Sequence, residues 1–187
     1  MNYFETIKCN DYKIYNLSYH EKRIANTIGK NINLQEYIYP INSKLLKCKV
    51  IYNQDEVISV SFLPYTKKII TTFKLVYDDE IKYKYKSEDR QRLEQLYLKR
   101  ENADEIIIVK NNLMTDTTIA NIAIFLENQW FTAKVPLLKG TTRQRYIDNL
   151  KIKEINITIK MLMNAHRIAL LNAMIDFDSI DEYKILV

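Results

Sequence analysis

Apolar and polar residues alternate in short runs along much of the chain, a pattern that predicts many strands and few helices. From Leu45 to Tyr85, four such runs separated by turn-forming residues predict an antiparallel meander. Its predicted strands are Lys47–Asn53, Val57–Leu63, Ile69–Val76 and Ile81–Tyr85. An earlier strand pair is predicted over Asn2–Ile14, with its turn near Asn10 and Asp11.

Helical periodicity is confined to a few segments. Ser18, followed by Glu21 three residues later, has the pattern of a capping box for a helix over Tyr19–Ile28, which Gly29 would end. A second helix is predicted over Glu88–Arg100 from the apolar face formed by Leu93, Leu96 and Tyr97. Beyond it, the pattern predicts strands at Glu105–Val109, Ala120–Leu126, Trp130–Thr132 and Ala169–Ile175, and helices at Thr141–Leu150 and Ile157–Ala165.

This order of elements predicts an α+β fold in two lobes. Strands come first, one helix follows, and strands then mix with helices. We expect a small N-terminal lobe over residues 1–85 and a larger C-terminal lobe over residues 86–187. Two-lobed folds usually place their chemistry in the crevice between the lobes.

Composition narrows the class of protein. The 47% hydrophobic content is enough for a core, whereas the longest apolar runs are far shorter than a membrane helix. No secretory signal precedes Cys9, and Cys9 and Cys48 have neither the number nor the spacing of a disulfide framework or zinc site. We therefore expect a cytoplasmic protein with no metal and no membrane partner.

Charge and glycine content exclude further classes. The 28 basic residues are scattered among 23 acidic ones, so the net charge of +5 does not indicate a nucleic-acid partner. With only two glycines, Gly29 and Gly140, no Rossmann, Walker or kinase glycine loop can be written. A bound phosphate would have to be held by side chains and by one turn around Gly140.

A lysine-rich segment offers the first candidate chemistry. Lys82, Lys84 and Lys86 alternate with apolar residues and would lie on one face of a strand. Lysine on an exposed edge strand commonly serves only to prevent unwanted pairing. A lysine at the strand end can instead be desolvated enough to act as a nucleophile, and the pattern does not choose between these interpretations.

Several short motifs decide the question because they follow the order and spacing of a known family. Lys86 precedes Arg90 by four residues, Asp104-Glu105 follows the predicted helix, and a threonine-acid motif runs from Thr115 to Asn121. The other matches are Phe4-Glu5-Thr6, His20-Glu21-Lys22-Arg23, Leu138-Lys139-Gly140-Thr141-Thr142-Arg143 and Leu171-Asn172-Ala173-Met174. With these motifs the chain resembles the class IV aminotransferase and 4-amino-4-deoxychorismate lyase family.

The resemblance implies a D-amino acid aminotransferase-like fold, with an antiparallel small lobe and a mixed larger lobe, and pyridoxal 5'-phosphate as cofactor. Lys86 would form the Schiff base and move protons, with Lys84 as the alternative if the register is shifted. Arg23 would pair with the phosphate through its guanidinium fork. Without the family motif, Arg23 would be read as an ordinary helix-surface residue.

The resemblance also assigns roles in the second half of the chain. Asp116 would face the pyridine nitrogen, although the family usually has the longer Glu there. Thr141 and Thr142 would bind the phosphate at the start of a helix, a position that also suits a plain turn and N-cap. The residues expected to line the ring and the opposite wall are Thr118, Ile119, Asn172 and Ala173. Arg167, after His166, is a candidate for binding a substrate carboxylate.

Within the family two activities are open. Compared with the family, the chain lacks the Gly-Asp-Gly leader and has a trimmed small lobe. In transaminases of the family, the leader and the small lobe build part of the pocket for a second, 2-oxo acid substrate. We therefore expect a 4-amino-4-deoxychorismate lyase that forms 4-aminobenzoate and pyruvate in folate synthesis, acting as a homodimer. The alternatives are an aminotransferase for branched-chain or D-amino acids, and a relative that binds ligands without catalysis.

Overall fold

The computed structural model describes residues 1–186, and the chain divides into two compact units. Unit 1 contains Met1–Lys67 and Tyr85–Asp89, and unit 2 contains Lys68–Lys84 and the chain from Arg90 onward. The bounds thus differ from a single division after residue 85. The chain enters unit 2 at residue 68 and returns to unit 1 for one short segment, because that segment pairs with the first strand through Tyr3 and Ser87.

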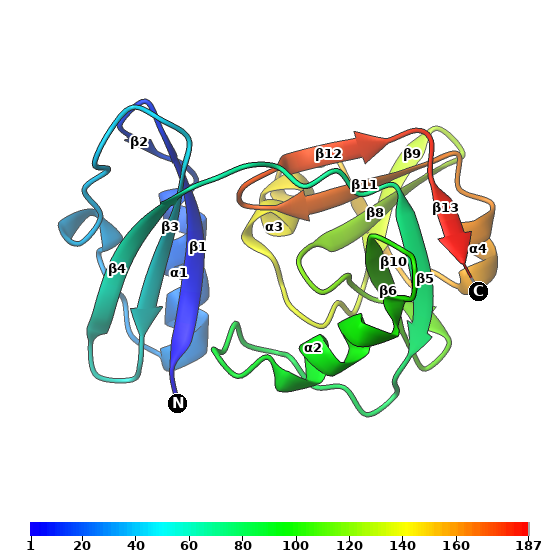
Figure 1. The fold of residues 1–187 in the computed structure, drawn as a ribbon, viewed down its shortest axis with the longest axis horizontal. Helices are drawn as coiled ribbons and strands as arrows, with labels where there is room; N and C mark the ends of the chain where they lie inside the picture. The colour runs from blue at the N-terminus through cyan, green and yellow to red at the C-terminus, as the bar shows by residue number, and fades with distance from the viewer. Residues whose placement is uncertain (187) are drawn as a thin grey trace. The chain divides into compact units, whose positions relative to one another are not determined.

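Unit 1 is a four-stranded antiparallel sheet with one helix on its inner face (Figure 1). The sheet order is β2-β1-β3-β4. Its elements are β1 (Tyr3–Asn10), β2 (Lys13–Ile14), α1 (Leu17–Ile28), η1 (Leu34–Glu36), β3 (Leu46–Tyr52) and β4 (Val57–Pro64). Alternate residues of β1, such as Ile7 and Cys9, pack against Ile24 and Ile28 of α1. The buried side chains of the strands, two residues apart, and the apolar face of α1 therefore form one core.

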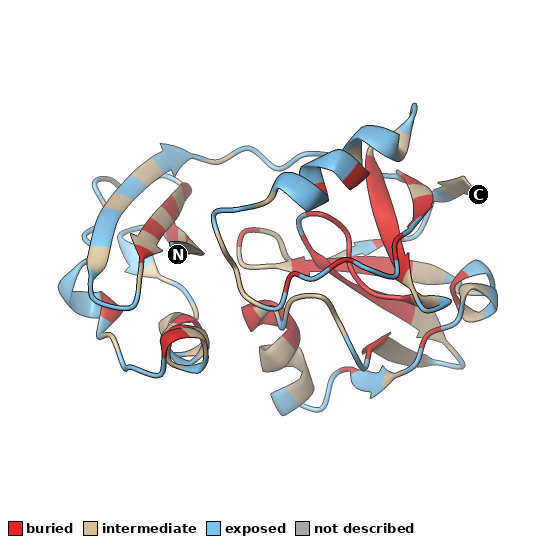
Figure 2. Cartoon of the chain, turned by 90° about the horizontal axis from the view of Figure 1, so that it is seen from below, coloured by how far each residue is buried: buried red, intermediate tan, exposed pale blue. Residues whose placement is uncertain are grey.

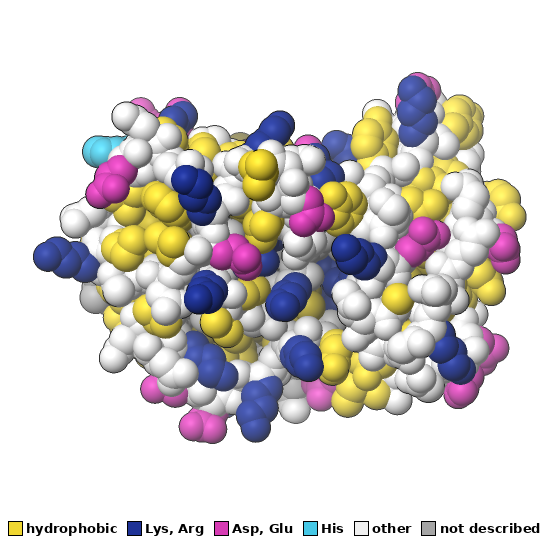
Figure 3. All heavy atoms as spheres, turned by 180° about the vertical axis from the view of Figure 1, so that it is seen from behind, with side chains coloured by type: hydrophobic (Ala, Val, Ile, Leu, Met, Phe, Trp, Pro, Cys, Tyr) yellow, Lys and Arg dark blue, Asp and Glu magenta, His cyan; other side chains and the backbone are white. Residues whose placement is uncertain are grey.

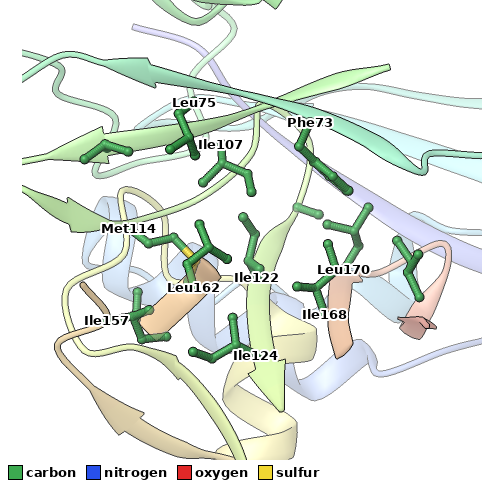
Figure 4. Close-up of a cluster of buried hydrophobic side chains, with 14 of the residues drawn as sticks. Phe73, Leu75, Ile107, Met114, Ile122, Ile124, Ile157, Leu162, Ile168 and Leu170 are labelled. Carbon is green, nitrogen blue, oxygen red and sulfur yellow. The ribbon is translucent and has the colours of Figure 1, made fainter. Parts of the chain in front are cut away.

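Unit 2 has two sheets that enclose the main core. One sheet has the order β13-β5-β6-β7 and the other β10-β9-β8-β11-β12. Their strands are β5 (Thr72–Tyr77), β6 (Glu105–Lys110), β7 (Leu113–Met114), β8 (Asn121–Leu126), β9 (Gln129–Ala133), β10 (Lys153–Ile155), β11 (Arg167–Asn172), β12 (Asp176–Ile180) and β13 (Lys184–Leu186). Phe73 and Ile107 of the first sheet pack against Ile122 and Leu170 of the second (Figure 4). Figure 2 shows the resulting buried centre of this unit.

Helices α2 (Gln91–Tyr97), with η2 (Leu98–Arg100), and α3 (Thr141–Asp148) cover the outer faces of these two sheets. Helix α4 (Ile159–Met163) instead contributes Leu162 to the core between the sheets. Leu93 and Leu96 of α2 pack with Ile106 and Ile108 on the outer face of the first sheet. The predicted apolar face of this helix is therefore confirmed for its two leucines.

The predicted four-stranded meander is wrong after its second strand. β3 and β4 pair antiparallel, as expected. β5, however, pairs in parallel with β6 on one side and with β13 on the other. Parallel neighbours need a crossover connection, which α2 provides. β5 is buried on both faces, through Phe73 on one and Val76 on the other, and so belongs inside unit 2.

The predicted strand over Ile81–Tyr85 is also absent. Its alternation survives, since Ile81 and Tyr83 are buried while Lys82 and Lys84 are exposed. No neighbouring strand pairs with it, and the Ile81 carbonyl accepts a hydrogen bond from Lys110 Nζ at 2.6 Å instead. A period-2 pattern records which side chains are buried and does not establish that the backbone joins a sheet.

Helix α1, which contains the His-x-x-Arg motif, starts earlier than predicted. Asn16, in the left-handed region at φ 55°, precedes α1, and its carbonyl accepts hydrogen bonds from Tyr19 and His20. The predicted capping box is therefore wrong, and the Glu21 carboxylate accepts from the amide of Leu34 at 2.9 Å. The predicted end at Gly29 is confirmed, with φ 73° and its amide bonded to Ala25.

Candidate functional site

A buried ion cluster in unit 1 links the first strand to α1. The Glu5 carboxylate accepts a hydrogen bond from Arg23 Nε at 2.8 Å and a second, shorter one from Arg23 Nη2. His20 Nδ1 lies 2.6 Å from the same carboxylate. Glu5 and His20 are fully buried, and the Arg23 side chain is 14% exposed. The fork of Arg23 is therefore fixed in orientation before any ligand binds.

The protonation of this cluster follows from its charges. Burial raises the pKa of Glu5, but the Arg23 charge and the hydrogen bonds from His20 and Arg23 outweigh it and bring that pKa to about 2. An ionised Glu5 requires the His20 proton on Nδ1. Burial, with help from the charges of Arg23 and Lys86, lowers the pKa of His20. His20 is thus neutral, and its Nε2 has no hydrogen-bond partner within residues 1–186.

Lys86 lies beside this cluster on the short segment that returns to unit 1. Its carbonyl accepts a hydrogen bond from the Phe4 amide at 2.8 Å, which fixes the backbone against β1. Its Nζ stands 4.6 Å from the centre of the Phe4 ring, and its charge acts on His20. Lys86 is half-buried, whereas Lys84 is exposed. Lys86 therefore lies within electrostatic range of His20.

Around Lys86 the outer face of the unit 1 sheet is basic, a feature that we did not identify from the sequence. The register pairs Lys8 directly with Lys47 and Thr6 with Lys49. Directly opposed like charges destabilise a sheet, so Lys8 and Lys47 indicate a surface suited to an anion. Lys49 Nζ lies over the same Phe4 ring as Lys86, at 5.1 Å. The alternation of β1 and β3 put these lysines on one face of each strand, but only the strand register shows that they lie opposite one another.

Asp116 is a buried acid of unit 2. Its carboxylate accepts hydrogen bonds from Asn121 Nδ2 at 2.7 Å and from the Leu138 amide at 2.9 Å. Burial raises the pKa of Asp116 to about 6, although these two donors and the Arg143 charge act in the opposite direction. Because this pKa of about 6 lies below neutral pH, the carboxyl group is mainly ionised at pH 7, as a partner to a protonated nitrogen must be.

Thr118 and Ile119 follow Asp116 on the turn that leads into β8. The Thr118 hydroxyl donates to the buried Glu105 carboxylate at 2.9 Å, and the Thr118 carbonyl accepts from Arg90 Nη2 at 2.8 Å. Ile119 is 47% exposed. The side chain of Thr118 is therefore committed to the protein, and its predicted contact with a cofactor would be made through the backbone.

The remaining predicted residues lie at a helix start and at a hairpin turn. Thr141 and Thr142 form the first turn of α3 and are both buried. Asn172 ends β11, where its side chain donates to the Ile119 carbonyl at 3.3 Å and accepts from the amide of Met174. Ala173 stands within the same turn. The structure thus brings the Ile119 turn and the Asn172 hairpin together.

Arg167 does not join this group. It begins β11, whereas Asn172 ends it, about 16 Å away at the rise of a strand. Its guanidinium lies 4.4 Å from the Phe125 ring centre and 3.8 Å from Asp181. His166 beside it is exposed. The predicted carboxylate binder therefore lies apart from the other candidate residues of unit 2.

Metal binding and membrane spanning receive no support from the part of the chain that is described. No group of three or more His, Cys, Asp or Glu in residues 1–186 could hold a metal ion. Within the same residues no helix is both long and apolar enough to cross a membrane. Figure 3 shows basic side chains interspersed with acidic and apolar ones, in keeping with the scattered charges of the sequence.

Comparison with solved structures identifies the fold class of the chain. The chain has a TM-score of 0.82 with a candidate amino-acid aminotransferase from Mesorhizobium loti, at 15% identity over 100% of this chain and 99% of that one. A hypothetical aminotransferase from Mycobacterium tuberculosis in its PLP-bound form gives a TM-score of 0.78 at 13% identity, covering 97% and 81%. The fold is that of the fold type IV aminotransferases.

The family follows from sequence. Residues 57–183 match the model of amino-transferase class IV. An uncharacterized protein of Haemophilus influenzae is 33% identical over 182 residues, which cover 91% of this chain and 96% of that protein. A candidate 4-amino-4-deoxychorismate lyase from Haemophilus somnus 129pt is 31% identical, with a TM-score of 0.86 over 92% and 96%. The chain belongs to the amino-transferase class IV family, whose enzymes depend on pyridoxal phosphate.

Proposed function

We propose that the chain is a pyridoxal-phosphate-dependent 4-amino-4-deoxychorismate lyase that forms 4-aminobenzoate and pyruvate. The observation that carries the proposal is the similarity to the candidate lyase from Haemophilus somnus, at 31% identity over nearly the whole of both chains. The basic face beside Lys86 supports it as well. A substrate with two carboxylates suits a surface on which Lys8 and Lys47 are directly opposed and Lys49 pairs with Glu88.

The residues present fit the cofactor by their chemistry. Unit 1 offers a primary amine at Lys86 for the aldehyde, and for the phosphate it offers the guanidinium of Arg23, whose Nε and Nη2 are held by Glu5. His20 adds a buried Nε2 that lacks a partner in residues 1–186. Unit 2 offers the Asp116 carboxyl for the pyridine nitrogen, and the start of α3 at Thr141 for an anion.

The protein's own groups would then divide the work. Pyridoxal phosphate, when bound, supplies an electron-withdrawing ring. Lys86 Nζ would hold the cofactor and then take up and return the proton of the substrate's α carbon. Asp116 would keep the pyridine nitrogen protonated. Thr142 would hold the phosphate through its backbone amide at the helix start.

Two assays test the proposal. The purified protein, loaded with pyridoxal phosphate, is given 4-amino-4-deoxychorismate, and we expect equal amounts of 4-aminobenzoate and pyruvate. It is then given branched-chain or D-amino acids with 2-oxoglutarate or pyruvate, and we expect no exchanged products. Amino-group exchange without 4-aminobenzoate would replace the lyase with the aminotransferase alternative, and failure to bind the cofactor would favour a non-catalytic relative. We also propose a homodimer, which sedimentation at several concentrations tests.

Replacing Arg23 with alanine is expected to weaken cofactor retention. A charge-assisted hydrogen bond contributes about 1.5–3 kcal/mol, so the Kd for pyridoxal phosphate should rise roughly 10- to 100-fold. Dialysis followed by a fluorescence titration measures this constant. Arg92→Ala, which breaks the more exposed pair with Asp78, is the control and should leave the Kd unchanged. An unchanged Kd in Arg23→Ala would remove Arg23 from the phosphate site.

Replacing Asp116 with asparagine is expected to slow turnover more than it weakens cofactor binding. The neutral amide cannot stabilise a positive pyridine nitrogen, and loss of such a buried charge partner reduces kcat by about 10²-fold. Steady-state kinetics and the Kd for the cofactor separate the two effects. Thr132→Val, which removes a buried hydroxyl bonded to the Ile122 carbonyl, controls for general damage to the core. An unaltered kcat in Asp116→Asn would contradict the partnership.

A further inference from the structure

Asn121 makes a set of contacts that none of the roles above explains. Its Nδ2 donates to Asp116 Oδ1 at 2.7 Å and to the Leu138 carbonyl at 2.8 Å. The Leu138 amide donates to the other Asp116 oxygen at 2.9 Å. Asp116 and Asn121 also pair through their backbones, and both are almost fully buried. One amide group thus closes a ring between the acid and the turn that precedes α3.

Gly140 provides a second and independent observation. A Cβ built at this glycine would stand 2.0 Å from Asn121 Oδ1, which is far closer than two non-bonded atoms can approach. The backbone at Gly140 has φ −69° and ψ 144°, which any residue adopts without strain. The glycine is therefore required for space and not for conformation, and the group that fills the space is the side chain of Asn121.

We propose that Asn121 is a positioning residue that joins Asp116 to the Leu138–Gly140 turn, so that the acid and the start of α3 are held as one rigid unit. Asn121 itself touches neither substrate nor cofactor. Its importance for catalysis rests on the proposed function, in which Asp116 faces the pyridine nitrogen and Thr141 and Thr142 hold the phosphate. The rigid unit itself is a property of the protein without cofactor, and it can be tested there.

The groups around Asp116 determine its pKa, and each of them must be known before a shift of that pKa can be assigned to Asn121. Arg143, on α3, is the charged group that acts on Asp116, and its own Nη2 donates to Glu154 and to the Ala133 carbonyl. The remaining influences are hydrogen bonds from Asn121 and from the backbone amides of Leu137 and Leu138. Removing the Asn121 donor, with Arg143 left in place, therefore isolates one contribution.

The first test follows the Asp116 carboxyl by carbon-13 NMR in cofactor-free protein, with Asp116→Asn to assign the signal. Asn121→Ala should move the titration midpoint to higher pH, because the ionised form loses a donor. The proton-binding constant should rise about tenfold, the effect of one lost charge-assisted hydrogen bond. Thr132→Val, a buried polar loss in the adjacent strand, should leave the midpoint in place. A midpoint that does not move in Asn121→Ala would overturn the proposal.

The second test is a double-mutant cycle between Asn121 and Gly140. Gly140→Ala alone should displace the Asn121 side chain, shift the Asp116 midpoint in the same direction and lower the Tm by several degrees. In the Asn121→Ala background the added methyl group no longer meets Oδ1, so Gly140→Ala should cause little further change. Additive effects on midpoint and Tm would show that Gly140 serves some other purpose, and would contradict the rigid unit.

These outcomes are independent of the proposed function. If the midpoint shifts and the cycle is non-additive, but the loaded protein yields no product, the lyase proposal fails while the role of Asn121 stands. If wild-type protein is an active lyase and Asn121→Ala retains the wild-type midpoint, only the positioning role fails. The pH profile of kcat then adds a check, because a positioning role predicts that its lower limb moves with the Asp116 midpoint.

Discussion

Lys86→Ala is expected to abolish both turnover and covalent capture of the cofactor. Lys86 Nζ stands over the Phe4 ring, and the charge of this half-buried amine acts on His20, which belongs to the same cluster as Arg23. A methyl group can neither form the bond to the aldehyde nor move a proton, and loss of acid–base catalysis alone costs about 10²- to 10⁴-fold. Product assays measure the first loss. Borohydride reduction followed by mass spectrometry of the peptides measures the second.

Two neighbouring lysines supply matched controls for Lys86. Lys84 lies two residues earlier and is exposed, so Lys84→Ala should retain turnover and should leave the trapped cofactor on Lys86. Lys49 shares the Phe4 ring, and Lys49→Ala should retain covalent capture even if substrate binding weakens. Capture that persists in Lys86→Ala and disappears in Lys84→Ala would show that the family register was shifted by one strand period.

Local signals predicted those elements whose cause is local. The predicted strands Ala120–Leu126 and Trp130–Thr132 leave a break at Glu127 and Asn128, and both residues have positive φ, as a tight hairpin turn requires. Gly29 ends α1 for the same kind of reason. The parallel pairing of β5 with β6 and β13 was not predictable in this way. Its partners are distant in sequence, and alternation within Thr72–Tyr77 does not record which strand lies next to it.

The candidate site shows the same limit from another side. Family motifs singled out Arg23 and Lys86 as candidates, but the residue that orients Arg23 was missed, although the sequence contained a signal for it. Glu5 lies on the same face of β1 as Ile7 and Cys9, so its side chain had to enter the core. A buried carboxylate needs cationic neighbours. Asn121, in contrast, was matched only as a letter of a motif. Its task depends on Gly140, nineteen positions later, which no local pattern connects to it.

Glu5→Gln is expected to be the most destabilising single substitution that preserves side-chain shape. Glu5 neutralises Arg23 and accepts a hydrogen bond from His20 Nδ1 in a fully buried position. Removing one partner of a buried ion pair leaves an uncompensated charge and costs about 3–5 kcal/mol. Chemical denaturation at pH 7 measures the free energy of unfolding. Glu88→Gln, which removes the partly exposed pair with Lys49, is the control and should cost less than about 1 kcal/mol.

The pH dependence gives this prediction its second, independent measurement. The folded pKa of Glu5, about 2, lies below its ordinary value of 4.5, so its contribution of about 3 kcal/mol is complete above pH 4.5 and is lost as pH falls toward 2. Buried His20, whose pKa is lowered from 6.5, adds a loss of stability as the unfolded chain protonates below that pH. Wild-type stability should therefore fall through both windows. Glu5→Gln should reduce the slope between pH 4.5 and 2, to which Asp78, Glu88 and Asp104 also contribute because their pKa values are lowered too. An unchanged slope there would mean that Glu5 does not hold this cluster together.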